Sequence, residues 1–488
     1  GPDASAPDAM DHGRYADPED FPSDGCVPGG FADGDLEAIF HIEIDPEGFT
    51  FTDALRLDRV DGGWSGLVAG GAPSYVRVDD DVVIAQVETD SGAVIAEYFC
   101  ARDPDGTVRG YDGYCPPADQ PEGECSTVPM KGVAIEQHGG PSSGLRLLGE
   151  YGPWPYDPWA PDGGISVNVR VAGEVAYLAR YQDGLRILDI GNPANIVERG
   201  HQPTEFPDDF EFYNDVKIAD GPNGKRYALM GSSVAGVVVV DVTDPASPAI
   251  VQHFGTRPGP GEAINVHTLF VDAGRAYITV LNVGFEIWDI ADPAAPVRLG
   301  GFEHPAGDAY LHDLSVQGDR AYLNYWDLGM AIVDVSNPAS PTLVGSFENY
   351  GQTSSHSNWV TQIGDRKIAV HGDEQWGSHV HLVDVTEGTA AFATSIGEWE
   401  TRPEVSVHNV MAAGTRAYLA YYQDGVRVLD IADPAKPRAI AHFQTHPGYD
   451  RRYGRSFFEG AIGIDLDLAR QRIYVADSHR GLIILELE

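Results

Sequence analysis

The sequence predicts an all-β protein in which a seven-bladed β-propeller follows a small, disulfide-containing β-sandwich-like region. The first observation is a short apolar run ending in an acid, which recurs seven times. The acids are Asp189, Asp241, Asp289, Asp334, Asp384, Asp430 and Glu486. They are 52, 48, 45, 50, 46 and 56 residues apart, a period typical of four-stranded blades in a ring. The second observation is that all four cysteines precede the repeats.

One repeat can be assigned strand by strand over residues 407–443. VHNVMAA predicts the innermost strand, TRAYLAYY the second, VRVLDI the third and RAIAHF the outermost. The turn before the outermost strand begins with Asp433-Pro434, and proline there fixes a turn dihedral and ends the strand. Four other copies carry Asn-Pro or Asp-Pro at this place, whereas the fifth has Glu387-Gly388.

The two ends of the repeat region are predicted to meet in one blade. The chain stops at LIILELE, which has the pattern of a third strand, so the last blade lacks its outermost strand. Residues 144–151 have the pattern of an outermost strand, because LRLLGEY resembles VRLGGF at 297–302. We therefore expect a propeller over 144–488 whose closing blade combines 144–151 with 460–488, which leaves no exposed sheet edge at the seam.

The N-terminal part divides into a predicted tether and a predicted domain. Residues 1–35 are rich in Asp, Pro, Ala and Gly, a composition typical of a disordered segment, and Gly1-Pro2 resembles the remnant of a cleaved tag. Residues 36–135 contain five β-rich segments separated by turn residues, which predicts a small antiparallel β-sandwich-like domain.

Cysteine usage indicates an exported protein. Cys26, Cys100, Cys115 and Cys125 match no zinc-binding spacing, so two disulfides are expected, with three pairings open. The expected location is secreted, periplasmic or at the cell surface, with a lipid anchor as one way of holding the tether. The sequence has no apolar stretch of the roughly 20 residues that span a bilayer.

The charge excludes some partners. The formal charge is −42, from 74 acids against 32 bases, and such a surface repels nucleic acids and anionic membranes. The acids either keep the protein soluble or collect cations. A protein, a glycan or a small molecule remains as the class of ligand.

The repeated phrase resembles the LVIVD repeat, a family of secreted or surface β-propellers named for that strand. The resemblance rests on the seven copies, covers about 340 residues, and implies a seven-bladed propeller. The family is mixed in function, so the resemblance assigns no chemistry to individual residues, and it does not extend to the N-terminal region.

Histidines open the innermost strands of consecutive blades. His267, His312 and His408 open the third, fourth and sixth, and His356 lies one residue upstream of the corresponding place in the fifth. The turn after the second strand of the fifth blade adds His371, Asp373 and His379. These positions converge at one end of a propeller channel, and imidazoles with carboxylates suit zinc, iron or copper. The alternative is that the histidines only bond turn carbonyls.

Calcium is a second candidate ion, at Asp79-Asp80-Asp81 or at Asp465 and Asp467, although neither matches a complete calcium loop.

The sequence is compatible with two functions. The first is an extracellular binding or scaffold protein with a metal or ligand site at the top of the channel. The second is a metal-dependent extracellular hydrolase or oxidoreductase that uses the histidines, and the sequence leaves open whether the protein is an enzyme.

Overall fold

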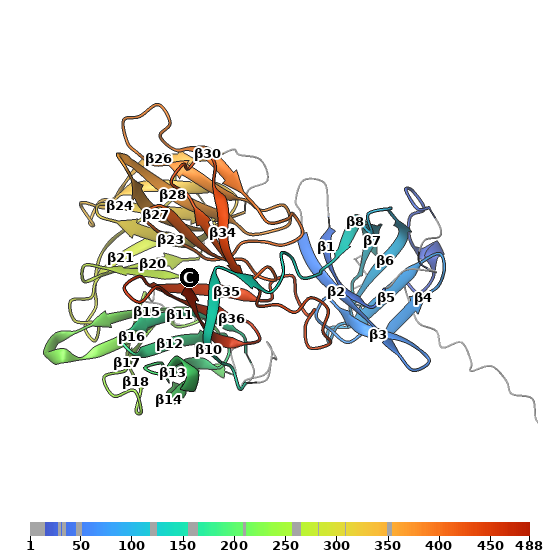
Figure 1. The fold of residues 1–488 in the computed structure, drawn as a ribbon, viewed down its shortest axis with the longest axis horizontal. Helices are drawn as coiled ribbons and strands as arrows, with labels where there is room; N and C mark the ends of the chain where they lie inside the picture. Colours follow the sequence, from blue (N-terminus) through green and yellow to red (C-terminus); the bar gives the residue numbers. More distant parts are fainter. Residues whose placement is uncertain are drawn as a thin grey trace, which may run out of the picture. The chain divides into compact units, whose positions relative to one another are not determined.

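The computed structural model describes residues 15–27, 31, 36–44, 51–117, 124–154, 164–207, 211–255, 265–281, 283–307, 309–348 and 354–488 (Figure 1). These residues form 37 strands and three short 3₁₀ turns, η1 (Pro18–Asp20), η2 (Pro193–Asn195) and η4 (Pro222–Gly224), which confirms the all-β class. Among them, no helix has the length and apolar character needed to cross a bilayer. The chain divides into two compact units, residues 1–137 with 447–459, and residues 138–446 with 460–488.

The N-terminal unit contains one antiparallel sheet of eight strands in the order β3-β2-β1-β8-β7-β6-β5-β4. The strands are β1 (Ala38–Ile44), β2 (Phe51–Val60), β3 (Gly63–Val68), β4 (Tyr75–Val78), β5 (Val83–Glu88), β6 (Val94–Arg102), β7 (Val108–Cys115) and β8 (Ser126–Ala134). The edge strand β3 approaches β4, β5 and β6, so the sheet is nearly closed. The predicted β-rich region thus takes the form of one curled sheet, whose interior holds a core that includes Phe40, Leu55 and Phe99.

Two disulfides hold this unit, as predicted, and the structure selects Cys26–Cys100 and Cys115–Cys125 among the three pairings. Part of the predicted tether folds onto the sheet, because Phe21 stacks on Tyr98 with ring centroids 4.4 Å apart. Tyr15 is also buried, and its hydroxyl donates to the carbonyl of Ser126 at 2.7 Å. The rest of the tether, residues 1–14, 28–30 and 32–35, lies outside the described residues.

Residues 447–459 lie between the last two blades in sequence but belong to the N-terminal unit. Arg451 donates to Glu37 at 3.0 Å, and the hydroxyl of Tyr449 donates to Asp58 at 3.0 Å. Phe457 is buried with its ring 4.6 Å from that of His41. The two units are therefore interleaved in sequence, which the composition of this segment did not indicate.

The second unit contains seven antiparallel sheets, one for each predicted blade, which confirms the seven-bladed propeller. The first blade contains β11 (Ser166–Ala172), β12 (Val175–Arg180), β13 (Gly184–Asp189) and β14 (Val197–Gln202), and the second contains β15 (Tyr213–Asp220), β16 (Arg226–Ser232), β17 (Gly236–Asp241) and β18 (Ala249–Phe254). The third contains β19 (Leu269–Asp272), β20 (Arg275–Val280), β21 (Gly284–Asp289) and β22 (Val297–Phe302). The fourth contains β23 (Leu311–Gln317), β24 (Arg320–Tyr325), β25 (Gly329–Asp334) and β26 (Thr342–Phe347). The fifth blade contains β27 (Ser355–Ile363), β28 (Arg366–Asp373), β29 (Val380–Asp384) and β30 (Thr394–Trp399). The sixth contains β31 (Val410–Ala413), β32 (Arg416–Ala420), β33 (Val426–Asp430), β34 (Arg438–Phe443) and β9 (Ser142–Ser143). The seventh contains β35 (Ala461–Asp467), β36 (Arg472–Asp477), β37 (Gly481–Leu487) and β10 (Leu145–Tyr151).

In six of the seven blades the repeated acid closes the turn that follows the third strand. Asp189 accepts the N–H of Gly191 at 3.0 Å, and Asp430 accepts that of Ala432 at 3.0 Å. The same bond, two residues along the chain, occurs at Asp241, Asp289, Asp334 and Asp384. An Asp side chain that binds the backbone two residues ahead mimics a turn, so the repeated phrase is structural.

The closing blade joins the two ends of the repeat region. The order of its strands is β10-β37-β36-β35, and Leu145 pairs with Leu487 in an antiparallel register. In Figure 1 the teal strand β10 lies beside the red strands of the C-terminal end. Strand β9, immediately before β10, adds to the edge of the sixth blade.

Candidate functional site

A β-bulge sets the direction of the histidine that opens the innermost strand in the fourth and fifth blades. His312 lies between the pairs Leu311↔Tyr325 and Asp313↔Asn324, so two residues of β23 face one of β24. His356 lies at the corresponding bulge of β27, between Ser355 and Ser357. A bulge leaves one residue out of the ladder and re-aims its side chain. The histidine of the fifth blade therefore has the same place as that of the fourth, although it lies one residue earlier in the sequence.

The four histidines form a continuous row of rings. The centroids of His267 and His312 are 4.1 Å apart, those of His312 and His356 are 4.2 Å apart, and those of His356 and His408 are 4.2 Å apart. At the end of the row, Nδ1 of His408 lies 2.9 Å from the carbonyl oxygen of Ile462 in the next blade. The predicted convergence of these four side chains is therefore present.

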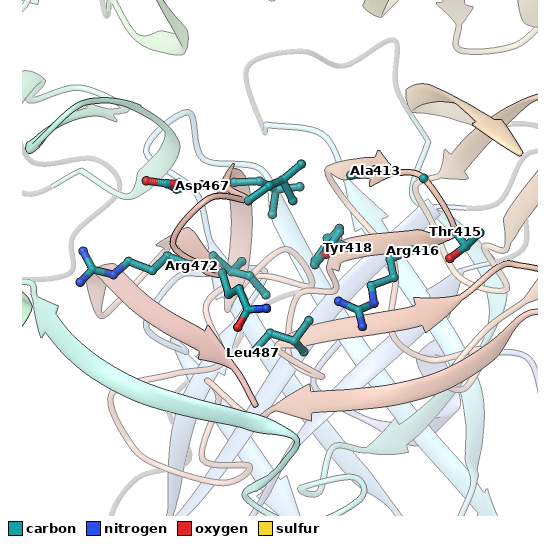
Figure 2. A pocket seen from close by; sticks show the side chains of 12 residues that line it. Ala413, Thr415, Arg416, Tyr418, Asp467, Arg472 and Leu487 are labelled. Carbon is teal, nitrogen blue, oxygen red and sulfur yellow. The ribbon is translucent and has the colours of Figure 1, made fainter.

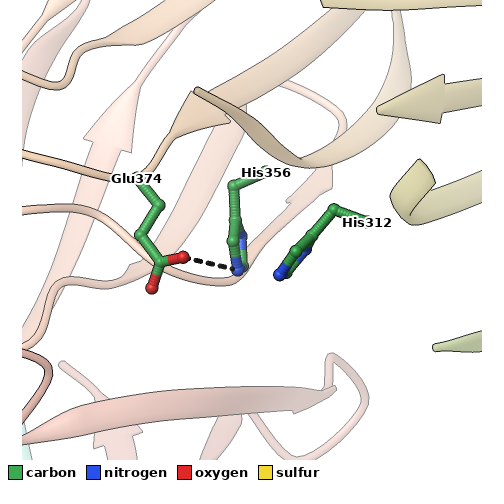
Figure 3. Close-up of side chains that lie close together, drawn as sticks. All are labelled: His312, His356 and Glu374. Atoms are coloured by element: carbon green, nitrogen blue, oxygen red, sulfur yellow. Dashed lines mark ion pairs between the residues drawn. The ribbon is translucent and has the colours of Figure 1, made fainter. Parts of the chain in front are cut away.

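Glu374 completes the site and was not among the predicted ligands. It directly follows β28, and its N–H donates to the carbonyl of Ser354 at 2.9 Å. Its Oε2 lies 3.4 Å from Nε2 of His356 (Figure 3). Its Oε1 lies 3.8 Å from Nε2 of His408. The hydroxyl of Tyr422 donates to the same carboxylate, so the sixth blade positions the acid of the fifth.

The place of Glu374 can be recognised by comparing the blades. Tyr181 and Trp326 also follow second strands, and their N–H groups donate to the carbonyls of Ile165 and Tyr310 at 2.8 and 2.9 Å. The same bond is made by Ser233, Leu281 and Ser478 in other blades, so the residue at this position varies but is uncharged in these five blades, whereas the fifth blade has an acid. The acid at this position was the available signal for Glu374.

Three of these residues form a candidate metal site. A ligand atom from each of His312, His356 and Glu374 lies within 4.8 Å of the other two, and all three residues are buried. Nitrogen and oxygen ligands lie about 2.0–2.2 Å from zinc, so donors that share one ion are separated by no more than about 4.4 Å.

Burial sets the protonation of the site. It lowers the pKa of His267 and of His408 to about 4, and it lowers the pKa values of His312 and His356 well below the usual range, with neighbouring histidines acting in the same direction. Burial raises the pKa of Glu374 to about 7. The four imidazoles are thus neutral at neutral pH, which is the form that ligates metal.

Acid is expected to destabilise the metal-free propeller. The four histidines bind protons more readily in the unfolded chain, so their contribution to stability is complete above pH 6.5 and is lost as the pH falls toward about 4. Glu374 acts in the opposite direction, because its raised pKa contributes stability that is lost as the pH rises through about 7. Four groups outweigh one, so we expect a loss of roughly 3 kcal/mol or more across the acidic window, measured by urea unfolding in the presence of chelator. A flat profile would contradict neutral, buried histidines.

The other three predicted ligands lie outside the row. Nε2 of His371 lies 2.9 Å from the Ser355 hydroxyl. Asp373 accepts from His381 at 3.1 Å, and the rings of His371 and His381 are 5.9 Å apart. His379 is partly exposed, with Nε2 3.6 Å from Glu400. The histidine-rich turn therefore separates into Glu374, which joins the row, and a second group within the fifth blade.

A polar ring closes the channel next to the histidines. In six blades a polar residue follows the opening position, directly or, in the fifth blade, two residues after His356. These residues are Asn168, Asp215, Thr268, Asp313, Asn358 and Asn409. Together with Arg170 and Lys217 they line a cavity of about 30 Å³. Asp215 accepts the N–H of Leu269 in the next blade at 3.0 Å and a bond from Lys217 at 2.6 Å. Burial raises the pKa of Asp313 to about 7 and lowers that of Lys217 to about 8. The ring ties neighbouring blades together.

The acids considered for calcium are engaged by the protein. Asp79 accepts the N–H groups of Asp81 and Val82 at 3.0 Å and a bond from Arg77 at 2.9 Å. Asp467 pairs with Arg470 at 2.8 Å. These contacts of Asp79 and Asp467 are those of ordinary turns.

A larger cavity lies at the opposite ends of the strands. It has a volume of about 460 Å³ and is lined by the turns of the sixth and seventh blades that join the first and second strands. Figure 2 shows Arg416 and Tyr418 on one side and Asp467 and Arg472 on the other. The cavity contains no histidine among its lining residues and is separate from the histidine row.

The sequence family agrees with the architecture. A model of the LVIVD repeat matches residues 163–204, 225–256, 306–349 and 406–445. The chain contains LVIVD repeats. The matched parts of this LVIVD-repeat propeller fall in the first, second, fourth and sixth blades, so the fifth blade, which supplies His356 and Glu374, lies outside them. No curated protein sequence matches the chain.

Solved structures with similar folds include other propellers. A chain from the "Crystal Structure of Mitotic Checkpoint Complex" is 11% identical, with 73% of this LVIVD-repeat chain and 98% of the other covered and a TM-score of 0.48. The "WD40 beta propeller domain of Doa1" is 12% identical, with 71% and 98% covered and a TM-score of 0.48. "U3-55K" is 11% identical, with 71% and 100% covered and a TM-score of 0.48. These similarities are too weak to carry an argument about function.

Proposed function

We propose that this LVIVD-repeat propeller is an extracellular binding protein that holds one transition-metal ion at the end of its channel where the innermost strands begin. His312, His356 and Glu374 are the ligands, with His267 and His408 beside them. The observation that carries the proposal is the convergence of two imidazoles and one carboxylate within 4.8 Å in a buried place. Imidazole with carboxylate suits zinc, iron or copper.

Two further features support the proposal. The histidines are neutral at neutral pH because burial lowers their pKa values, so no proton must leave before an imidazole binds metal. The four cysteines are paired in two disulfides, which are typical of secreted, periplasmic or cell-surface proteins. The partner of such a protein would be another protein, a glycan or a small molecule.

A metal-dependent enzyme is the second candidate. Three convergent ligands leave coordination positions open on a bound ion, which is the arrangement of catalytic rather than structural metal sites. The Tyr422 hydroxyl bonded to Glu374 would then keep the carboxylate in a fixed orientation. A hydrolase or an oxidoreductase would both use such an ion.

Metal content tests the proposal. The purified chain is incubated with zinc, iron or copper, desalted and analysed by elemental mass spectrometry, and we expect about one ion per chain. The paired substitutions His312→Ala and His356→Ala are expected to remove it, and Glu374→Gln is expected to weaken binding by about 10–100-fold. His253→Gln is the control, since His253 pairs with Glu205 at 2.6 Å, outside the row. Full metal content in the double variant would exclude this site.

A further inference from the structure

Two aromatic side chains flank the histidine row on the fourth blade. The ring of Tyr310 is 5.5 Å from that of His312, and the ring of Trp326 is 5.1 Å from it. Tyr310 also meets His267 edge-on at 6.4 Å, and Trp326 meets His356 edge-on at 6.3 Å. The backbone N–H of Trp326, after β24, donates to the carbonyl of Tyr310, before β23, at 2.9 Å, so a backbone bond holds both residues beside the row.

These two aromatic residues are partly exposed, whereas the histidines they flank are almost fully buried. Tyr310 and Trp326 have intermediate exposure, while His312 is 6% and His356 is 2% exposed. A molecule that reaches the site from the side of these aromatic residues therefore meets aromatic surface before it meets the metal ligands. Aromatic rings pair favourably in tilted and edge-on geometries with centroids 4.5–7 Å apart, so this surface favours a flat aromatic guest over an aliphatic one.

The phenol of Tyr310 adds a polar contact near the same place. Tyr310 is partly exposed, and a phenol hydroxyl is able to donate to an oxygen of a guest. The opposite side of Glu374 is occupied by Tyr422, so this donor lies on the side of the fourth blade.

Charge narrows the class of guest. The chain carries a formal charge of −42, which opposes the approach of phosphorylated or other multiply charged anions. A phenol arrives neutral and becomes an oxygen donor only at the metal, where its proton is released to solvent. The two imidazoles and the carboxylate leave positions for such a donor on the ion.

We infer that the ligand of the metal site is a small phenolic molecule, whose oxygen binds the ion and whose ring packs against Tyr310 and Trp326. This inference rests on the proposed metal function. It assigns Trp326 and Tyr310 as the residues that select an aromatic ligand, while His312, His356 and Glu374 hold the ion. No covalent change of the phenol is part of the inference.

The test uses the full chain loaded with iron(III) or copper(II), with catechol as the probe and cyclohexane-1,2-diol as its non-aromatic counterpart. Coordination of a phenolate to either ion produces a visible charge-transfer band, and its titration gives the affinity. We expect catechol to bind and cyclohexanediol not to compete. Trp326→Leu is expected to weaken catechol binding about tenfold with metal content unchanged, because an aromatic pair is lost.

Trp288→Leu is the matched control, since Trp288 lies 5.1 Å from Phe254 in another blade, away from the row. If Trp326→Leu does not fold, Tyr310→Leu carries the same expectation. Metal binding without any preference for catechol over cyclohexanediol, or an unchanged affinity in both variants, would overturn this inference and leave the metal site intact. Absence of bound metal in the unaltered chain would overturn both proposals.

Discussion

Replacing Leu145 by Asp is expected to destabilise the propeller by about 4 kcal/mol or more, because the substitution buries a carboxylate at the seam of the ring. Leu145 is 3% exposed and belongs to an apolar cluster that joins the sixth and seventh blades. The cluster includes Tyr418 and Val428 of the sixth blade and Ile473 and Leu485 of the seventh. Urea unfolding of the propeller, followed by tryptophan fluorescence, measures the loss.

The same strand supplies the control. Leu147 also pairs with a residue of β37, Leu485, but its side chain is 39% exposed. Leu147→Asp therefore leaves the new carboxylate in water and is expected to change stability by no more than about 0.5 kcal/mol. Equal stability of the two variants would show that β10 is dispensable for the ring. A large loss confined to Leu145→Asp would show that closing the ring stabilises the propeller.

Ring closure was predictable because the pattern of an outermost strand is missing after the last repeat and present before the first, at residues 144–151. A four-stranded blade needs an outermost strand, and the last repeat ends at its third strand. The only requirement for recognising LRLLGEY as the missing strand was its similarity to the outermost strands of other blades. The role of the six repeated aspartates was equally predictable, since each of them accepts from an N–H two residues ahead and needs no distant partner.

The candidate site was predictable only in part. His267, His312 and His408 share one position in the repeat, so their convergence followed from the architecture. His356 required the bulge of β27, in which Ser355 and Ser357 pair while His356 does not, and a pattern of alternating residues does not reveal a bulge. The acid at position 374 could be noticed by comparing the blades, but its contact with Tyr422 of the next blade joins residues 48 positions apart, and neither local sequence indicates that contact.

The pairing of the strands in the N-terminal unit could not be predicted from the sequence. Its strands were visible as β-rich segments, but the pairing of β1 with β8 joins residues about 90 positions apart, and local patterns do not specify which strands pair. The inclusion of residues 447–459 in this unit depends on contacts such as Arg451 with Glu37. Both features depend on long-range contacts, so local patterns could not distinguish one curled sheet from two facing sheets.

Glu97→Gln is expected to stabilise the N-terminal unit by about 2 kcal/mol at pH 8, because it removes a buried carboxylate that has no compensating partner. Glu97 is 0% exposed, and neither of its oxygens accepts a hydrogen bond from a described residue. It pairs across β6 and β7 with Asp112, and Asp53 acts on it as well. Ala85 faces it from β5, so the groups that surround it are acidic or apolar.

The pH dependence identifies the cause. Burial, with Asp112 and Asp53, raises the pKa of Glu97 well above its usual range, and burial raises the pKa values of Asp53 to about 7 and of Asp112 to about 6. The folded unit thus holds protons that the unfolded chain releases, and its stability falls as the pH rises from about 4 through about 7. Hydrogen exchange of β6 in the full chain, followed by mass spectrometry, measures this decline, which Glu97→Gln is expected to reduce.

Glu88→Gln is the matched control, because Glu88 ends the neighbouring strand β5 and is exposed. It is expected to leave both the stability and its pH dependence unchanged. A Glu97→Gln variant that is less stable than the unaltered chain at pH 8 would contradict the prediction, since it would mean that the carboxylate is ionised and held by a cation in the folded unit. A buried carboxylate without such a cation is costly when charged. A gain in stability on Glu97→Gln therefore indicates that Glu97 is protonated in the folded unit, and a loss indicates that its carboxylate binds a cation.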